Sequence, residues 1–154
     1  MISIIVAVDK NWLIGNGSSL PWHFEEDLQY FKEKTMGKFV LMGKNTYEFL
    51  PSKLPGRKII VLSREKEGEL EGVDVASSIE EALSLASGEV MVAGGRSVYE
   101  QFLKIADRIY LTRIDKEFEG DVYFPKLDER EWELIEEKRG ENNLLNFQVI
   151  ERKK

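Results

Sequence analysis

The chain of 154 residues is 42% hydrophobic and 32% charged, with one histidine and no cysteine, so it can bury a core as a single domain without covalent cross-links. This composition excludes disulfides, cysteine-ligated zinc, thiol nucleophiles, iron–sulfur clusters and a multi-histidine metal site. The net charge of −6 argues against general binding to nucleic acid or to a membrane surface, and no apolar run approaches the roughly 20 residues of a membrane span. We therefore expect a cytoplasmic protein.

The first half of the chain predicts alternating strands and helices. Ile2–Val8 is a nearly continuous apolar run, which is typical of a strand buried on both faces. Asn11–Leu20, rich in glycine and serine, is predicted to be a mobile loop that ends at Pro21. The next predicted elements are a helix at Phe24–Lys34, a strand at Lys38–Met42, a short helix that opens at Gly43 and ends near the Pro51–Pro55 loop, and a strand at Lys58–Leu62.

The second half continues the alternation. Its predicted elements are a weak strand at Val73–Ala76, a helix at Ile79–Ala86 capped by Ser78, a strand at Val90–Ala93, a helix to about Ile105 and a strand at Ile109–Ile114. After an acidic loop at Asp115–Asp128, alternation in Trp132–Lys138 and Leu145–Ile150 predicts a closing antiparallel pair. We therefore expect an α/β fold with a mostly parallel sheet and helices on both faces. Without repeats or linkers, residues 1–154 are expected to form a single domain.

Asp27 is the first candidate for chemistry. Its helix presents one apolar face at helical spacing, made by Phe24, Leu28, Phe31 and Thr35, and Asp27 falls on that face. A carboxylate that points inward must be paired, protonated or directed at a ligand, because burying an unpaired charge is costly. Glu25 and Glu26, in the same turn, need no role beyond complementing the helix dipole.

Two glycine-containing junctions follow predicted parallel strands. Gly43-Lys44-Asn45-Thr46 follows one strand, and Gly94-Gly95-Arg96-Ser97 follows another. Each can be an ordinary turn, since neither matches a known phosphate-binding motif. Both would lie at the same edge of the sheet, where α/β proteins bind ligands, and helix N-termini attract phosphate. Together they suit a dinucleotide, which has two phosphates to place.

Positive charge gathers in residues 32–66, which we call the basic segment. It holds nine basic and three acidic residues, so its charge is +6 against −12 for the remainder. This pattern fits either a small anionic ligand or a solvated basic surface. Arg57, after the turn Leu54-Pro55-Gly56, can clamp a carboxylate in bidentate geometry or be one of these solvated charges. We interpret His23 as a structural or surface residue, because no serine or acid at a suitable spacing supports a catalytic triad.

Several motifs together resemble chromosomal dihydrofolate reductase of the bacterial type. They occur in the family's order and spacing, and they are Ile14-Gly15, Leu20-Pro21-Trp22, Asp27-Leu28-x-x-Phe31-Lys32, Met42-Gly43-Lys44-Asn45-Thr46, Leu54-Pro55-Gly56-Arg57, Gly94-Gly95 with Tyr99, Tyr110-Leu111-Thr112 and Phe118-Glu119-Gly120-Asp121. The resemblance covers essentially the whole chain. It implies an eight-stranded, mostly parallel sheet and NADPH-dependent reduction of 7,8-dihydrofolate to tetrahydrofolate. Such an enzyme supports one-carbon metabolism and thymidylate synthesis, and it is a target of antifolates.

The resemblance also implies roles for individual residues. Asp27 would bind the amino group and ring N–H of the pterin and favour a protonated N5, Thr112 would support Asp27, and Trp22 would hold a water. The loop from Ile14 to Leu20 would close over the nicotinamide, braced by the segment around Asp121. The implied substrate-binding residues are Ile5, Asp27, Leu28, Phe31, Lys32, Phe49, Leu54, Arg57, Ala93 and Thr112. The implied NADPH-binding residues are Ala7, Ile14, Gly15, Gly43, Lys44, Asn45, Thr46, Leu62, Ser63, Arg64, Gly94, Gly95, Arg96, Ser97, Val98, Tyr99 and Gln101.

The chain departs from the family's usual pattern at a few of these positions. Lys44 stands where many relatives have arginine, so a bidentate phosphate grip becomes a point charge. Ala93 stands where a larger branched residue usually packs against the pterin. Leu20, which the resemblance implies as a catalytic residue with Asp27, Trp22 and Thr112, replaces a common methionine. The resemblance further implies a cis peptide between Gly94 and Gly95.

Two other functions remain open at this point. A pyrimidine reductase of riboflavin synthesis shares the fold and NADPH, but its substrate gives no reason for Trp22 with Asp27 or for Arg57. A noncatalytic nucleotide-binding module would bind NADPH without turnover. No metal is expected, the partners are small molecules, and a monomer is favoured over a dimer.

Overall fold

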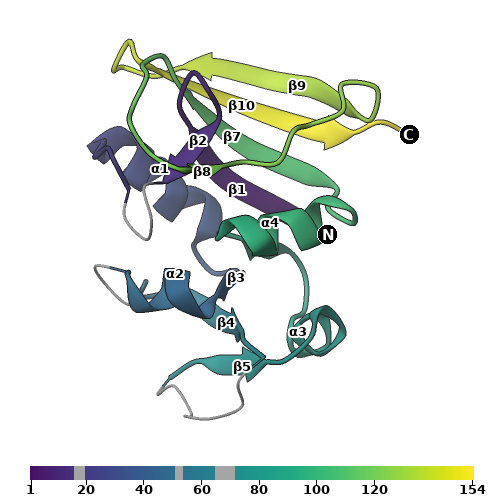
Figure 1. The fold of residues 1–154 in the computed structure, drawn as a ribbon. Helices are drawn as coiled ribbons and strands as arrows, with labels where there is room; N and C mark the ends of the chain where they lie inside the picture. The colour runs from purple at the N-terminus through teal and green to yellow at the C-terminus, as the bar shows by residue number, and fades with distance from the viewer. Residues whose placement is uncertain (16–19, 51–53, 65–71) are drawn as a thin grey trace.

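The structure of the chain is a computed structural model that describes residues 1–15, 20–50, 54–64 and 72–154 (Figure 1). Parts of two predicted loops, Asn11–Leu20 and Pro51–Pro55, lie outside the described residues. So do three charged side chains of the basic segment, Lys53, Glu65 and Lys66.

The main sheet of the described residues has eight strands in the order β5-β4-β3-β6-β1-β7-β10-β9. Neighbouring strands are parallel except that β10 runs antiparallel to both β7 and β9. The predicted parallel sheet with a C-terminal antiparallel pair is therefore confirmed. Its strands are β1 (Ile2–Val8), β3 (Phe39–Gly43), β4 (Lys58–Leu62), β5 (Asp74–Ala76), β6 (Val90–Val92), β7 (Arg108–Ile114), β9 (Trp132–Arg139) and β10 (Leu145–Arg152).

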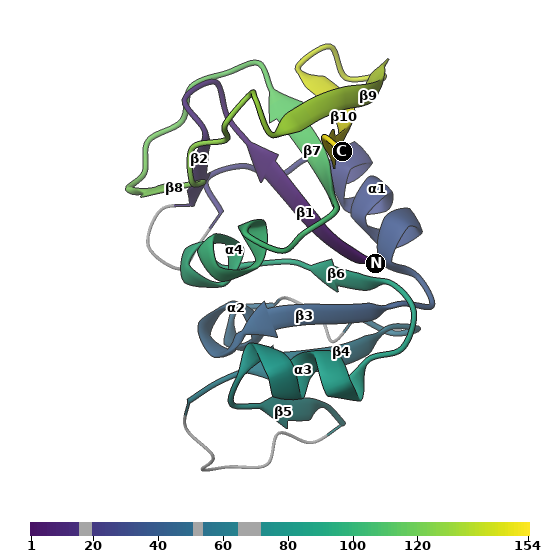
Figure 2. The same cartoon turned by 90° about the vertical axis from the view of Figure 1, so that its right-hand side faces the viewer.

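Helices cover both faces of this sheet, as predicted (Figure 2). They are α1 (Glu25–Thr35), α2 (Lys44–Glu48), α3 (Ile79–Leu85) and α4 (Arg96–Leu103). Successive residues of the central strand β1 show the two layers, because strand side chains alternate between faces. Ile4 packs in the core cluster that includes Phe102 of α4, whereas Ile5 packs in the cluster that includes Phe31 of α1. In the part of the chain that the structure describes, no helix is both long and apolar enough to cross a membrane.

A second, small sheet lies where two loops are predicted. β2 (Leu13–Gly15) falls within the predicted loop Asn11–Leu20, and β8 (Val122–Tyr123) falls within the predicted acidic loop Asp115–Asp128. The two strands pair antiparallel. Gly120 makes their close approach possible, because a Cβ at this position would lie 2.5 Å from the carbonyl oxygen of Gly15. The N–H of Asp121 donates to the same oxygen at 3.3 Å. Leu13–Gly15 is therefore paired strand rather than loop.

Local features of two helices test finer predictions. Ser78 caps α3 as predicted, since its Oγ accepts a hydrogen bond from the N–H of Glu81 at 3.1 Å. α1 begins one residue later than predicted, and Phe24 is its N-cap without a side-chain hydrogen bond. Leu28 was predicted to lie on the buried face of α1, and this is wrong because its side chain faces a cleft and is 45% exposed.

Candidate active site

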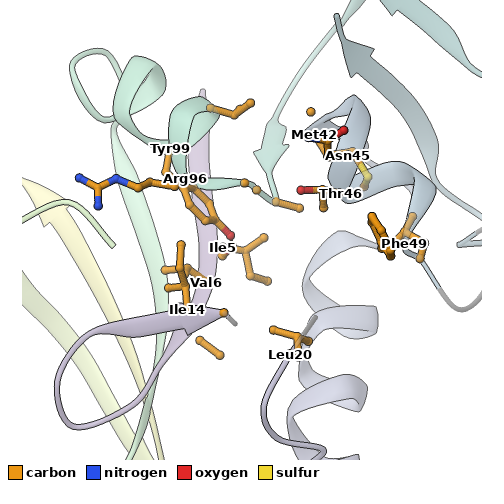
Figure 3. Close-up of a pocket in the computed structure, with 18 of the residues that line it drawn as sticks. Ile5, Val6, Ile14, Leu20, Met42, Asn45, Thr46, Phe49, Arg96 and Tyr99 are labelled. Carbon is orange, nitrogen blue, oxygen red and sulfur yellow. Dashed lines mark hydrogen bonds between the residues drawn. The ribbon is translucent and has the colours of Figure 1, made fainter. Parts of the chain in front are cut away.

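A large cleft of about 1530 Å³ opens where the carboxyl ends of the parallel strands meet. Its walls come from β1 on one side and from β3 and α2 on the other. Figure 3 shows Ile5 and Val6 facing Asn45, Thr46 and Phe49 across it. A cleft of this kind at this edge of an α/β sheet is the usual place for a ligand.

Every residue that the resemblance implies for catalysis, substrate or cofactor lines this cleft, from Ile5 on β1 to Thr112 on β7. Other lining residues had not been singled out by sequence reasoning or had been set aside, and they are Val6, His23, Phe24, Tyr30, Met42, Glu48, Leu50, Ser77, Ser78 and Val122. Sequence signals could have found two of them. Tyr30 lies three positions after Asp27 and so on the same face of the helix, and Ser77 directly follows the carboxyl end of β5.

Asp27 meets Thr112 across the cleft wall. The Thr112 hydroxyl donates to Oδ1 of Asp27 at 2.8 Å. Thr112 is buried on β7, beside Ala7 of β1, so the strand pairing fixes its position. Burial raises the pKa of Asp27, the hydrogen bond from Thr112 opposes this, and the charge of Glu26 adds to the rise. The site therefore holds a carboxyl group that binds a proton more readily than an exposed aspartate does.

Aromatic rings flank this pair. Trp22 lines the cleft, and its ring lies 5.2 Å from that of Phe118. Tyr30, one helical turn after Asp27, stacks on Phe147 of β10 with ring centroids 4.4 Å apart. The phenol of Tyr99 donates to the carbonyl of Ile5 at 2.8 Å, and burial raises its pKa so that it stays protonated. These contacts fix the rings and the backbone around the carboxyl group.

Large apolar side chains line the cleft without being buried by the protein. Leu20, Leu28 and Phe49 are 63%, 45% and 61% exposed. Phe31 and Leu54 lie in the same lining. Exposed apolar side chains that converge on one cavity indicate a site for a ligand with an apolar part.

Arg57 lines the same cleft as these apolar side chains. Its Nη1 donates to the buried hydroxyl of Thr35 at 3.3 Å and its Nε to the carbonyl of Pro55 at 3.2 Å. Thr35 in turn donates to the carbonyl of Phe31 at 2.7 Å. Partial burial lowers the pKa of Arg57, which nonetheless stays protonated near neutral pH. The arginine is thus held in place by its partners, and it lines the same cleft as Lys32.

The two glycine junctions lie against each other, as the parallel strands predict. The N–H of Gly43 donates to the carbonyl of Gly94 at 2.9 Å, and the peptide between Gly94 and Gly95 is cis. A Cβ on Gly95 would lie 3.2 Å from Oγ1 of Thr46, so a larger residue would crowd this contact. No side chain caps α4, and its first-turn N–H groups have no partner within the helix. The junctions therefore present backbone donors to an anion in the cleft.

Basic and hydroxyl side chains continue this anion-binding edge. β3 and β4 are parallel neighbours with Gly43 opposite Leu62, so Lys44 and Ser63 follow at matching positions. Lys44, Ser63 and Arg64 all line the cleft. Arg96 lines it too and forms an ion pair with Glu100 at 2.8 Å. Positive charge at this edge suits a phosphate group.

The structure also gives positions for the remaining titratable side chains that sequence reasoning raised. His23 is on the surface as predicted, and its Nε2 lies 2.8 Å from a carboxylate oxygen of Glu25. Among the described residues, no group of three or more His, Cys, Asp or Glu side chains is placed to hold a metal ion.

Comparisons with known proteins agree on one family. The family model described as "Dihydrofolate reductase" matches residues 1–154. Dihydrofolate reductase of Bacillus subtilis (strain 168) is 41% identical over 155 residues, which cover 97% of this chain and 92% of the relative. Dihydrofolate reductase type 3 of Salmonella typhimurium is 43% identical over 138 residues, which cover 88% of this chain and 85% of the relative. A solved dihydrofolate reductase from Enterococcus faecalis, complexed with NADP(H) and RAB-propyl, has a TM-score of 0.93 at 34% identity and covers 100% of this chain and 97% of that chain.

Proposed function

The chain belongs to the dihydrofolate reductase family, and from this we infer that it reduces 7,8-dihydrofolate to 5,6,7,8-tetrahydrofolate with NADPH. One observation of the site carries the inference. A single cleft joins the Asp27–Thr112 pair to the paired glycine junctions, so a substrate ring and a dinucleotide can lie side by side. Hydride transfer requires this proximity, since reacting atoms must be held close together and shielded from water.

Asp27 is proposed to bind the pterin and to favour the protonated form of N5. A carboxylate accepts hydrogen bonds from both an amino group and a ring N–H, which matches one edge of the pterin. The 2.8 Å bond from Thr112 holds the other side of the carboxyl group, so its orientation is set before substrate binds. Trp22 is proposed to hold a water close to this pair.

The residues at the glycine junctions fit NADPH. Gly95 has no side chain, so its backbone is open to a close approach by the cofactor. A Cβ at this position would lie 3.2 Å from Oγ1 of Thr46. The junctions would hold the pyrophosphate, and Lys44, Ser63 and Arg64 the 2′-phosphate. Ala7 and Ile14 would hold the carboxamide. NADPH, when bound, supplies the hydride.

Arg57 and the apolar slot are proposed to bind the rest of the substrate. Leu28, Phe31, Phe49 and Leu54 would contact the pterin and benzoyl rings, and Arg57 the α-carboxylate of the glutamate tail. The support is geometric, since Arg57 is braced by Thr35 at 3.3 Å and lies in the same cleft. Guanidinium and carboxylate pair in bidentate fashion, which fixes the orientation of the tail.

One assay tests the function and separates the two alternatives. We expect NADPH to be consumed, with loss of its absorbance, only when dihydrofolate is present. NADPH binding without consumption would instead indicate a noncatalytic nucleotide-binding module. Consumption with a ribosylated pyrimidine substrate, and not with dihydrofolate, would indicate the reductase of riboflavin synthesis.

We further propose that the chain acts as a single domain and as a monomer. One chain supplies every implied residue of the cleft, so the site needs no second subunit. Sedimentation at working concentration tests this, and a dimer would contradict it.

A further inference from the structure

Glu26, the residue before Asp27, holds a turn that is distant in sequence. Its Oε2 accepts a hydrogen bond from the N–H of Glu141 at 2.8 Å, and its Oε1 accepts one from the N–H of Asn142 at 2.9 Å. These two N–H groups belong to the turn between β9 and β10. Hydrogen bonds to a charged acceptor are the stronger kind, and two of them fix direction as well as distance.

Gly140 makes room for this contact. A Cβ at this position would lie 2.8 and 3.0 Å from the two carboxylate oxygens of Glu26. The turn is also braced internally, because the N–H of Gly140 donates to the carbonyl of Leu145 at 2.8 Å and that of Leu145 to Asn142 at 2.9 Å. The donors that Glu26 meets are therefore held in place independently of α1.

The same turn is connected rigidly to Thr112. β10 follows the turn and pairs with β7 in a register that sets Phe147 opposite Thr112 and Leu145 opposite Ile114. The N–H of Asp115, just after β7, donates to the carbonyl of Leu144 at 2.7 Å. The turn and Thr112 are thus joined through two directly paired strands.

The first turn of α1 is otherwise held to these strands by the Asp27–Thr112 hydrogen bond and by apolar packing. Its N-cap, Phe24, packs against the cluster of Ile114, Leu145 and Phe147 but makes no side-chain hydrogen bond. The Tyr30–Phe147 stack holds the helix to β10, but one helical turn further along. Glu26 adds a charge-assisted contact between the start of the helix, where Asp27 lies, and the turn that leads into β10.

We propose that Glu26 is a positioning residue for the reaction: through the β9–β10 turn it sets the first turn of α1 so that Asp27 meets Thr112 and the pterin. This rests on the proposed function. Mutual placement of the two partners matters because small displacements of positioning groups cost large factors in rate. Glu26 also acts on Asp27 electrostatically, since its charge raises the pKa of that carboxyl.

The contact can be broken from either side. Glu26→Ala removes the carboxylate that accepts the two hydrogen bonds. Gly140→Ala keeps this carboxylate in the protein but places a methyl group where it would clash with the carboxylate oxygens. We expect each variant to lower kcat for dihydrofolate by about tenfold at a temperature where it is fully folded, with KM for NADPH nearly unchanged. Glu26→Gln keeps the length and one acceptor oxygen, so its loss should be smaller.

A double-mutant cycle separates this role from general destabilisation. If both substitutions break the same contact, the double variant should be no slower than the slower single variant. The matched control is Glu25→Gln, which removes a charge from the same turn but contacts His23 instead, and its kcat should stay close to wild type. Losses that add independently, or lowered stability with normal kcat, would overturn the proposal.

A measurement without turnover keeps this inference distinct from the proposed function. The N–H of Leu28 donates to the carbonyl of Phe24 at 3.1 Å and so reports on the first turn of α1. Its hydrogen exchange should be faster in Glu26→Ala and in Gly140→Ala, and unchanged in Glu25→Gln. Unchanged exchange in the first two variants would refute the clamp whatever the wild type catalyses, whereas a wild type unable to reduce dihydrofolate would refute the proposed function.

Discussion

At the scale of single residues, the charge of Asp27 lowers the stability of the fold but is needed for activity. Burial raises its pKa, so the folded protein holds the proton more tightly than the unfolded chain, whose pKa is near 3.8. The stability that this group contributes is therefore full below that pH and is lost as pH rises through the folded pKa. An amide at this position keeps the shape and the acceptor for Thr112 but has no proton to lose.

Asp27→Asn should therefore gain stability relative to wild type as pH rises through this window, and then level off. Its turnover at pH 7 should fall by at least about 100-fold, because an amide cannot favour protonation of N5. The defect should shrink in acid, where more dihydrofolate is already protonated. Urea unfolding and pH–rate profiles of both proteins measure these effects. A variant that is less stable at pH 7 and turns over normally would show that the carboxylate is structural.

Arg57→Leu should weaken binding of the substrate tail. A charge-assisted hydrogen bond contributes about 1.5–3 kcal/mol, so KM for dihydrofolate should rise roughly tenfold to hundredfold while KM for NADPH changes little. An analogue without the glutamate should not respond. Lys58→Gln is the control, since this neighbouring charge lies over the ring of Phe39 rather than in the cleft. If the analogue slows as much as dihydrofolate, Arg57 does not bind the tail.

Sequence alone placed Asp27 on the correct face, because helical periodicity is a local property. Helical spacing alone misjudged the exposure of Leu28, although the resemblance implied a substrate-binding role for it, and it missed the partners of Glu26, for one reason. The exposure of Leu28 depends on a cleft built by other strands, and the partners of Glu26 lie 115 and 116 positions away. A helix-dipole role for Glu26 was sufficient locally, and only the folded turn reveals its other contacts.

At the scale of elements, the parallel neighbours β3 and β4 carry a prediction about the cofactor. Their carboxyl ends place Lys44, Ser63 and Arg64 at one edge of the cleft. Lys44→Gln with Arg64→Gln should raise KM for NADPH by roughly hundredfold or more, at about 1.5 kcal/mol or more for each of the two lost contacts to phosphate. KM for NADH, which lacks the 2′-phosphate, should hardly change.

Steady-state kinetics with both cofactors measures this preference. Arg130→Gln is a suitable control, because this exposed arginine pairs with Asp128 and does not line the cleft. Equal losses with NADPH and NADH would place Lys44 and Arg64 away from the 2′-phosphate.

The long apolar strands were predictable, and the shortest ones were not. β1 and β4 have the predicted bounds, since continuous apolar runs mark strands buried on both faces. β2 and β8 have three and two residues, too few for alternation to register. Their pairing depends on the close approach of Gly120 to Gly15, which no local pattern encodes.

At the scale of the whole molecule, Asp9 joins distant segments. This buried carboxylate accepts hydrogen bonds from the N–H of Leu13 at 2.9 Å and of Phe118 at 3.0 Å. It also accepts one from Asn11 at 2.8 Å. Through Phe118, whose ring meets Trp22, Asp9 supports the wall of the cleft.

Asp9→Asn should lower the free energy of unfolding by about 1.5–3 kcal/mol, because its amide group would turn a donor toward at least one backbone N–H. Urea unfolding measures the loss. Asp115→Asn makes the same chemical change at an exposed ion pair with Lys10, where at most about 1 kcal/mol is expected. Equal effects at the two positions would refute a joining role for Asp9.

The strand order has a consequence for synthesis on the ribosome. β1 is made first, yet its partners β6 and β7 come much later, since Ile4 pairs with both Val92 and Ile109. β10, the last strand in chain order, covers the free edge of β7. An emerging chain that has not reached β10 leaves that edge of β7 open, although every residue that lines the cleft has already been made. Thr112 is then held by β1 alone, so we expect dihydrofolate to stabilise chiefly those molecules whose translation has passed β10.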